Sequence, residues 1–115
     1  MATGSIKSGT SKIVSLESGA SSVNHYGYVC KDPNTGTCRI WVVARSSSNI
    51  STTTVLAVVQ SGYRPKTNVS LFGAVAAADG LMNAFYGTLK TNGEITQGAG
   101  STIREVFLTG EYLCE

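Results

Sequence analysis

Three residues in one short segment carry the chemistry best suited to binding a ligand. Trp41 lies between Arg39 and Arg45 in the run CRIWVVAR, residues 38–45, where alternate side chains of a strand would face the same side. An indole ring packs against the C–H groups of a sugar, and guanidinium groups donate hydrogen bonds to hydroxyls at a wet surface. The spacing predicts a saccharide platform centred on Trp41. Two alternatives are a Trp stacked by its arginine neighbours and a Trp buried at a subunit interface.

A second candidate contact lies in the loop ADG, residues 78–80. Asp79, together with Asn83, offers short polar groups at the end of an expected strand. Such groups hydrogen-bond to sugar hydroxyls. The alternative interpretation is an ordinary turn, because Asp and Gly favour turn conformations.

Catalytic and cofactor motifs are missing from the sequence. The single histidine, His25, lies in the alternating segment NHYGYV and is expected to be a partly exposed sheet residue instead of a general base. The seven carboxylates show no paired spacing that would support a glycosidase site. Phosphate-cradling glycine loops and nucleophile elbows are absent too. We therefore predict a binding or structural module without catalytic residues, cofactor or metal, and not an enzyme.

The three cysteines permit two interpretations. Cys30 and Cys38 flank the turn KDPNTGT, so a hairpin could set them opposite each other at a distance that a disulfide spans. We favour the alternative of three small, mostly buried thiols including Cys114, because a domain of this size has a core of its own. A zinc site built from these thiols and His25 lacks the paired short spacings of known zinc motifs.

Length and charge narrow the class of protein. A chain of 115 residues with 42% hydrophobic content is expected to form one globular domain. Its net charge of +2 is spread thinly, without the basic cluster that nucleic-acid binding requires. No stretch approaches the apolar length of a membrane helix, and residues 1–15 lack the apolar core of a signal peptide, so we expect a soluble chain without membrane insertion.

Periodicity of two predicts an all-β fold, and 13 glycines with many Ser and Thr residues argue against helices. Turn residues separate the expected strands, and Asn92-Gly93 predicts a tight hairpin of the primed type. A short helix over residues 71–82 is the weaker alternative. The Gly/Ser-rich residues 1–23 are expected to form an arm or edge strand, and residues 24–115 an antiparallel β-sandwich or jelly roll. The expected strands are residues 11–16, 24–31, 38–45, 53–60, 68–75, 81–91, 103–108 and 112–114.

The second half of the chain carries a larger pattern. The run VLAVVQ at 55–60 precedes Gly62-Tyr63-Arg64-Pro65, which is followed by NVSLFGAV, by the hairpin GTLKTNGEIT at 87–96 and by a closing VFLTGEYL at 106–113. In this order the segments resemble the C-terminal head domains of phage tail-fibre and receptor-binding (baseplate) proteins. The resemblance covers residues 53–115; the first half and the cysteines lie outside it.

The resemblance implies a homotrimeric head in the virion, at the tip of a tail or fibre, made in the host cytoplasm. Its partners would be a host-surface saccharide and other tail or baseplate proteins. An alternative is a structural trimerisation or connector domain without a receptor, and a weaker one is a carbohydrate-binding appendage of a depolymerase. The residues that carry over are expected to define the fold: Gly62, Tyr63, Arg64, Pro65, Asn92, Gly93 and Tyr112.

The GYRP motif at residues 62–65 has a structural interpretation of its own. Gly62 permits a chain reversal, and Pro65 holds Arg64 extended. The ring of Tyr63 is expected to be buried with its hydroxyl on a backbone group, and Arg64 to pair with an acid such as Glu105 or Glu111. The motif therefore predicts a rigid corner between two strands.

Overall fold

The all-β prediction is confirmed. The computed structural model describes residues 11–77, 82–98 and 103–115, and within these ranges the chain forms nine strands and no helix. The alternative of a helix over 71–82 is wrong where the chain is described, because strand β6 occupies residues 69–77. The strands are β1 (Lys12–Ser15), β2 (Glu17–Ser18), β3 (Asn24–Asp32), β4 (Thr37–Ile50), β5 (Ala57–Val58), β6 (Val69–Ala77), β7 (Met82–Leu89), β8 (Glu94–Gln97) and β9 (Ile103–Leu113).

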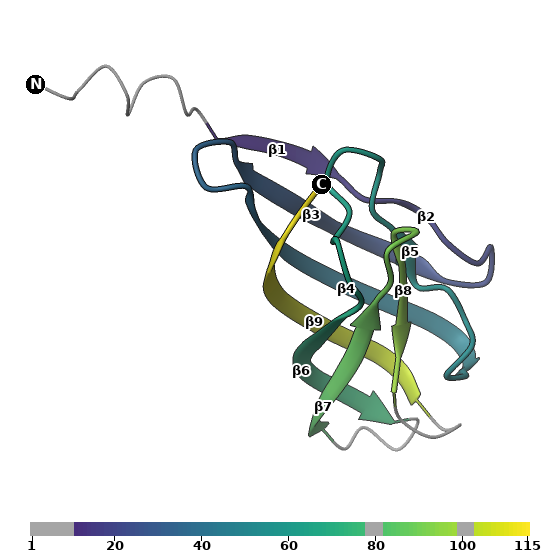
Figure 1. Cartoon of the computed structure of the whole chain (residues 1–115). Helices are drawn as coiled ribbons and strands as arrows, with labels where there is room; N and C mark the ends of the chain where they lie inside the picture. Colours follow the sequence, from purple (N-terminus) through teal and green to yellow (C-terminus); the bar gives the residue numbers. More distant parts are fainter. Residues whose placement is uncertain (1–10, 78–81, 99–102) are drawn as a thin grey trace, which may run out of the picture.

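The strands form a single antiparallel sheet that curls until it nearly closes. Its order is β1-β3-β4-β9-β6-β7-β8-β5-β2. The first and last strands of this order, β1 and β2, are separated in the chain by one residue, Leu16. Figure 1 shows β8 crossing in front of β4, and β7 crossing in front of β9. The two halves of the sheet thus face each other across a common core, as in a β-sandwich or barrel.

Alternation along the long strands separates core from surface. Cys38, Ile40, Val42 and Ala44 of β4 are buried, while the residues between them point outward. Strand β9 repeats the pattern with buried Leu108 and its outward neighbours. The period of two read from residues 38–45 is therefore the period of the folded strand.

Glycines on the inner side allow the sheet to bend sharply. Gly27 lies opposite Val42, and Gly73 lies opposite Leu108. A Cβ atom on Gly27 would overlap the carbonyl oxygen of Trp41, and one on Gly73 would overlap that of Phe107. Only glycine permits such close backbone approach, which is typical of strongly bent strands.

The strand predicted for residues 53–60 is mostly wrong. Only Ala57–Val58 is strand, and residues 52–54 form a turn. Hydroxyl groups stabilise that turn, since Ser51 Oγ lies 2.9 Å from Thr54 Oγ1. The apolar residues that follow are nonetheless in the core, and Leu56 donates its N–H to the Ile95 carbonyl oxygen at 2.8 Å.

The hairpin at Asn92-Gly93 exists, but its turn is not of the primed type. A primed turn needs positive φ at both central residues. Here only Gly93 has positive φ, at 91°, and no non-glycine residue of the described chain does. Lys90 and Glu94 pair through N–H and carbonyl at 2.9 Å, and Gly93 donates back to Lys90 at 2.9 Å. This geometry is a type I turn closed by a left-handed glycine.

The GYRP motif forms a corner, with different fastenings from those expected. Gly62 has φ of 94°, and Pro65 forms an isolated bridge to Cys114. Arg64 does not pair with an acid; its Nε donates to the Val59 carbonyl oxygen at 2.9 Å. The hydroxyl that reaches the backbone belongs to Tyr112, which donates to the Tyr63 carbonyl oxygen at 2.7 Å. The corner is thus held to the end of β9.

The strand register separates Cys30 from Cys38. Cys30 lies opposite Arg39, and Cys38 lies opposite Lys31, so the two thiols are on opposite sides of the sheet. A disulfide between them is excluded by this register, and all three cysteines are free. Cys38 and Cys114 are buried as expected, whereas Cys30 is partly exposed. The neighbour of Cys38 is Tyr112 of β9.

The buried cluster of Cys38, Tyr112 and Cys114 makes the domain less stable at alkaline pH. Burial, with Cys114 beside it, raises the pKa of Cys38 from 9.0 to about 12, and burial also raises the pKa of Tyr112. The unfolded chain therefore loses these protons first, and the free energy of unfolding is expected to fall as pH rises from about 9 towards 12. Urea unfolding at several pH values should show a shallower fall for Cys38→Ala than for the wild type. An equal slope in both proteins would exclude Cys38 as a cause.

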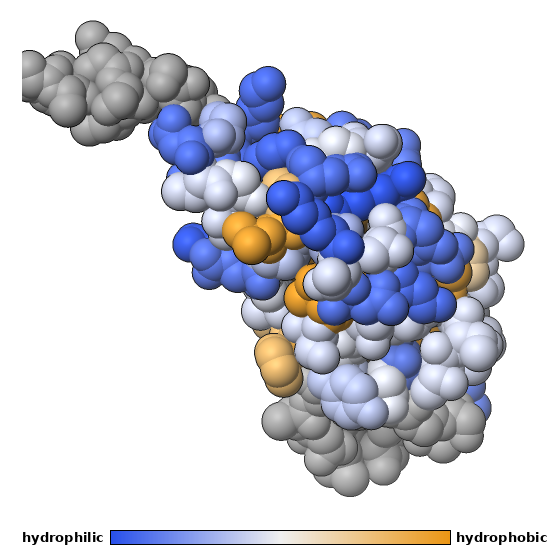
Figure 2. All heavy atoms as spheres, viewed as in Figure 1, coloured by the Kyte–Doolittle hydropathy of each residue, from blue (hydrophilic) through white to orange (hydrophobic). Residues whose placement is uncertain are grey.

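The face of the molecule drawn in Figure 2 is largely polar. Figure 2 shows hydrophilic residues over most of the visible face, with small separate hydrophobic patches between them. In the described residues no helix has the length and apolar character needed to cross a membrane.

Candidate functional site

Strands β3, β4 and β9 place four aromatic side chains on the outer side of the sheet. Tyr28 lies opposite Trp41, while Tyr26 and Phe107 lie on either side of Val43. Residues directly opposite one another share a side of the sheet, and residues two apart in a strand do as well. Tyr26, Tyr28, Trp41 and Phe107 therefore form one outward-facing group.

The rings of this group touch one another. Tyr26 meets Trp41 edge-on with ring centroids 5.3 Å apart, and Phe107 meets it at 6.0 Å and 64°. Tyr28 lies parallel to Trp41, at 6.4 Å and an interplanar angle of 9°. Contacts of this kind favour one ring orientation. Rings from β3 and β9 therefore hold Trp41 in place, and the two tyrosines of β3 among them are exposed to solvent.

The aromatic surface continues across the sheet. Thr109 lies between Trp41 and Phe72, and Phe72 lies opposite Tyr86 of β7. Tyr26, Tyr28 and Phe72 are 59%, 50% and 65% exposed. Large exposed apolar areas on a protein surface often mark sites of interaction. We call this surface the aromatic face, made of Tyr26, Tyr28, Trp41, Phe72, Tyr86 and Phe107.

Both predicted arginines lie on this side of the sheet, each in an ion pair. Arg39 Nη2 is 3.8 Å from Glu111 Oε1, and Arg45 Nη2 is 3.3 Å from Glu105 Oε1. Both pairs are largely exposed, so water and salt weaken them. The arginines can therefore exchange their carboxylate partners for a ligand at little cost.

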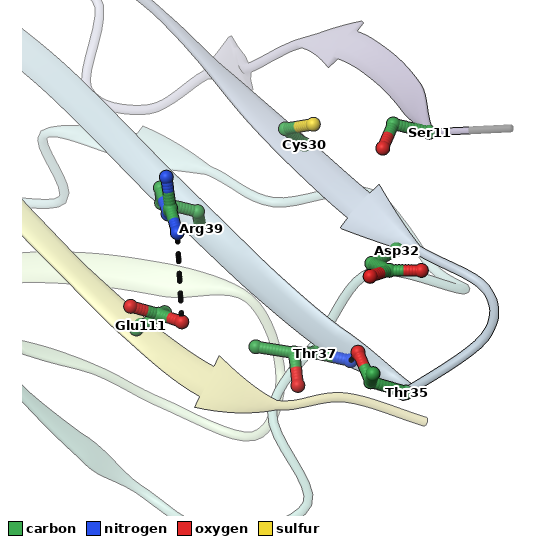
Figure 3. Close-up of a pocket in the computed structure, with 7 residues that line it drawn as sticks. All are labelled: Ser11, Cys30, Asp32, Thr35, Thr37, Arg39 and Glu111. Carbon is green, nitrogen blue, oxygen red and sulfur yellow. Dashed lines mark hydrogen bonds and ion pairs between the residues drawn. The ribbon is translucent and has the colours of Figure 1, made fainter. Parts of the chain in front are cut away.

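Two hollows lie beside Arg39, and Trp41 lines the first of them. The first, of about 350 Å³, is lined by Ile13, Tyr28, Trp41 and Thr109 among others, and we call it the platform hollow. The second has about 380 Å³ and is mostly polar; we call it the polar hollow. Cys30 and Arg39 line both, so the two hollows are neighbours. Figure 3 shows the residues of the polar hollow: Ser11, Cys30, Asp32, Thr35, Thr37, Arg39 and Glu111.

The predicted second contact cannot be joined to this site. Asp79 lies outside the described residues. Asn83 belongs to β7, where its backbone lies opposite Val75, and its side chain is outside the described part. The described site therefore rests on Arg39, Trp41 and Arg45 alone among the predicted contacts.

The site predicted from the sequence does not include the residues that surround Trp41. Tyr26 and Tyr28 are two apart in NHYGYV, so alternation alone puts them on one side of a strand. The same holds for Phe107, Thr109 and Glu111 in β9. Their meeting with Trp41 depends on β3 and β9 flanking β4, which alternation does not reveal.

The arrangement offers contact surface and hydrogen-bonding groups. Among the described residues, no cluster of three or more His, Cys, Asp or Glu side chains could hold a metal ion. His25 is partly buried with Nε2 3.4 Å from the Leu16 carbonyl oxygen, away from the aromatic face. Comparisons with known proteins find neither a family model nor a curated protein that matches this chain.

Proposed function

We propose that this chain is a non-enzymatic domain that binds a saccharide at the Trp41 end of the aromatic face, on the side of Thr109 away from Phe72. The single observation that supports it best is the group around Trp41, whose ring lies parallel to that of Tyr28 at 9°. Stacking against Tyr28 holds the indole of Trp41 in one orientation, and sugar rings pack their C–H side against aromatic rings held in this way. Arg39 and Glu111 at its edge supply a donor and acceptors for hydroxyls.

The biological setting comes from the sequence resemblance. A head domain of a phage tail fibre or baseplate would use such a face to attach the virion to a saccharide on the host surface. The resemblance also supports a homotrimer that is assembled with other tail proteins. These points are part of the proposal.

A glycan array tests the binding itself. Purified protein is expected to bind a restricted set of glycans, and the binding glycan should reduce virion adsorption when added free in solution. The single tryptophan of the chain is Trp41, so its fluorescence should change on titration with the same glycan. Binding without any change in Trp41 emission would place the site elsewhere on the molecule.

A second candidate function is a structural trimerisation or connector domain. The observation that favours it is the width of the aromatic face, since Phe72 and Tyr86 are 65% and 52% exposed well beyond Trp41. Large apolar surfaces also serve as subunit interfaces. Light scattering separates the candidates: the structural domain should be a trimer that loses mass when the aromatic face is mutated.

A further inference from the structure

We infer that the polar hollow is a second saccharide subsite, and that the site takes an uncharged oligosaccharide of two or more sugar residues. The inference rests on the proposed function, because it extends the platform around Trp41. Its basis is that Cys30 and Arg39 line both hollows. A second sugar linked to one in the platform hollow would therefore follow a path past these two residues into the polar hollow.

The strand register gives the direction of this path. Trp41, Arg39 and Thr37 alternate along the outer side of β4, towards the hairpin that joins it to β3. Asp32 and Thr35 lie at that hairpin, and Figure 3 shows them at the end of the polar hollow away from Arg39. Successive residues on one side of a strand are about 6.6 Å apart, from about 3.3 Å rise per residue. The path from Trp41 to Thr37 thus has room for more than one sugar ring.

The groups along the path suit hydroxyls. The carboxylates of Asp32 and Glu111 accept hydrogen bonds, while the hydroxyls of Thr35 and Thr37 donate and accept. Asp32 Oδ1 already accepts the N–H of Asn34 at 2.9 Å, which orients the carboxylate. An oriented acceptor loses less conformational entropy when a ligand binds.

The charge of the polar hollow disfavours acidic sugars. Its lining includes two carboxylates, Asp32 and Glu111, against one guanidinium, Arg39. Arg39 lies 3.8 Å from Glu111, so an acidic sugar that paired with Arg39 would leave Glu111 without this partner. A uronic acid in this hollow would place a third carboxylate beside Asp32 and Glu111, and like charges repel. Uncharged sugars avoid this cost.

The test uses neutral hexose oligosaccharides of one to four residues and their counterparts oxidised to uronic acids at C6. Trp41 emission reports the platform, and alkylation of Cys30 reports the junction, because Cys38 and Cys114 are buried. We expect tighter binding from one residue to two, protection of Cys30 by the longer neutral sugars, and weaker binding of the uronic acids.

Asp32→Asn provides the matched variant. It preserves an oxygen that can accept the Asn34 N–H and removes the charge. Affinity for the neutral disaccharide is expected to fall about tenfold, and the preference over the uronic acid should shrink. Glu94 lines a different hollow, and Glu94→Gln makes the same change of charge there. This control should alter neither the affinity for the neutral disaccharide nor the preference over the uronic acid.

The outcomes separate the inference from the function on which it rests. If Trp41 emission responds but longer sugars gain no affinity and leave Cys30 reactive, the second subsite is wrong and the platform stands. If uronic acids bind as well as neutral sugars, the charge selectivity is wrong. If neither the array nor Trp41 emission responds to any glycan, both proposals fall.

Discussion

Trp41→Ala is expected to weaken saccharide binding at least about 30-fold, the effect of losing about 2 kcal/mol at an interface hot spot. Trp41 is the centre of the aromatic face, in ring contact with Tyr26, Tyr28 and Phe107. Removing it takes away the central ring of the site and loosens the rings that it orders. Isothermal calorimetry with an array-positive glycan measures the loss, and virion adsorption measures its consequence.

Phe72→Ala is the matched control for this variant. Phe72 is also an exposed aromatic residue of the same face, but it lies beyond Thr109 on β6. It should leave saccharide affinity within about twofold, as for surface substitutions that change a free energy by about 0.5 kcal/mol or less. Unchanged adsorption by Trp41→Ala, with the oligomer intact, would refute the proposed site. A fall in oligomer mass would support the structural domain.

Gly73→Val is expected to destabilise the domain by about 3 kcal/mol or more. The new Cβ would overlap the carbonyl oxygen of Phe107 on the neighbouring strand, and a backbone atom cannot rotate away. Domains of this size have only about 5–15 kcal/mol of total stability. The melting temperature should therefore fall by about 10 °C or more, as measured by circular dichroism or calorimetry.

Ala74→Val is the matched control on the same strand. Ala74 is the next residue of β6 and lies opposite the outward-facing Phe107, so its side chain is on the outer side of the sheet and not on the side of the core. Its melting temperature should stay close to that of the wild type. Equal destabilisation by both variants would show that β-branching, and not close strand approach at Gly73, limits this position.

The alternation of apolar and polar residues predicts most strands correctly. It fails where hydrogen bonds between short polar side chains favour a turn. The alternation in residues 38–45 describes β4 correctly, although the strand runs on to Ile50. In residues 53–60 the hydroxyls of Ser51, Thr53 and Thr54 bond to one another and form a turn. Short side chains that bond locally offer the backbone an alternative to the sheet, and an apolar count does not include this effect.

The GYRP corner is likewise predictable from local sequence only in part. Its existence follows from Gly62 and Pro65, whose backbone preferences are local. Its fastenings do not, because Tyr112 lies 49 positions from Tyr63. Arg64 binds the nearby Val59 carbonyl, while Glu105 and Glu111 pair with Arg45 and Arg39.

By itself the sequence determined the all-β class, the inward and outward sides of β4, and the outward position of Arg39, Trp41 and Arg45. These follow from a period of two, which is a property of neighbouring residues. Only the tertiary structure decided which strands flank β4. Trp41 meets Phe107, and Arg39 meets Glu111, because β9 pairs with β4 although the two strands are far apart in the sequence. Strand order arises from long-range packing, so the aromatic face and both hollows appear only in the folded sheet.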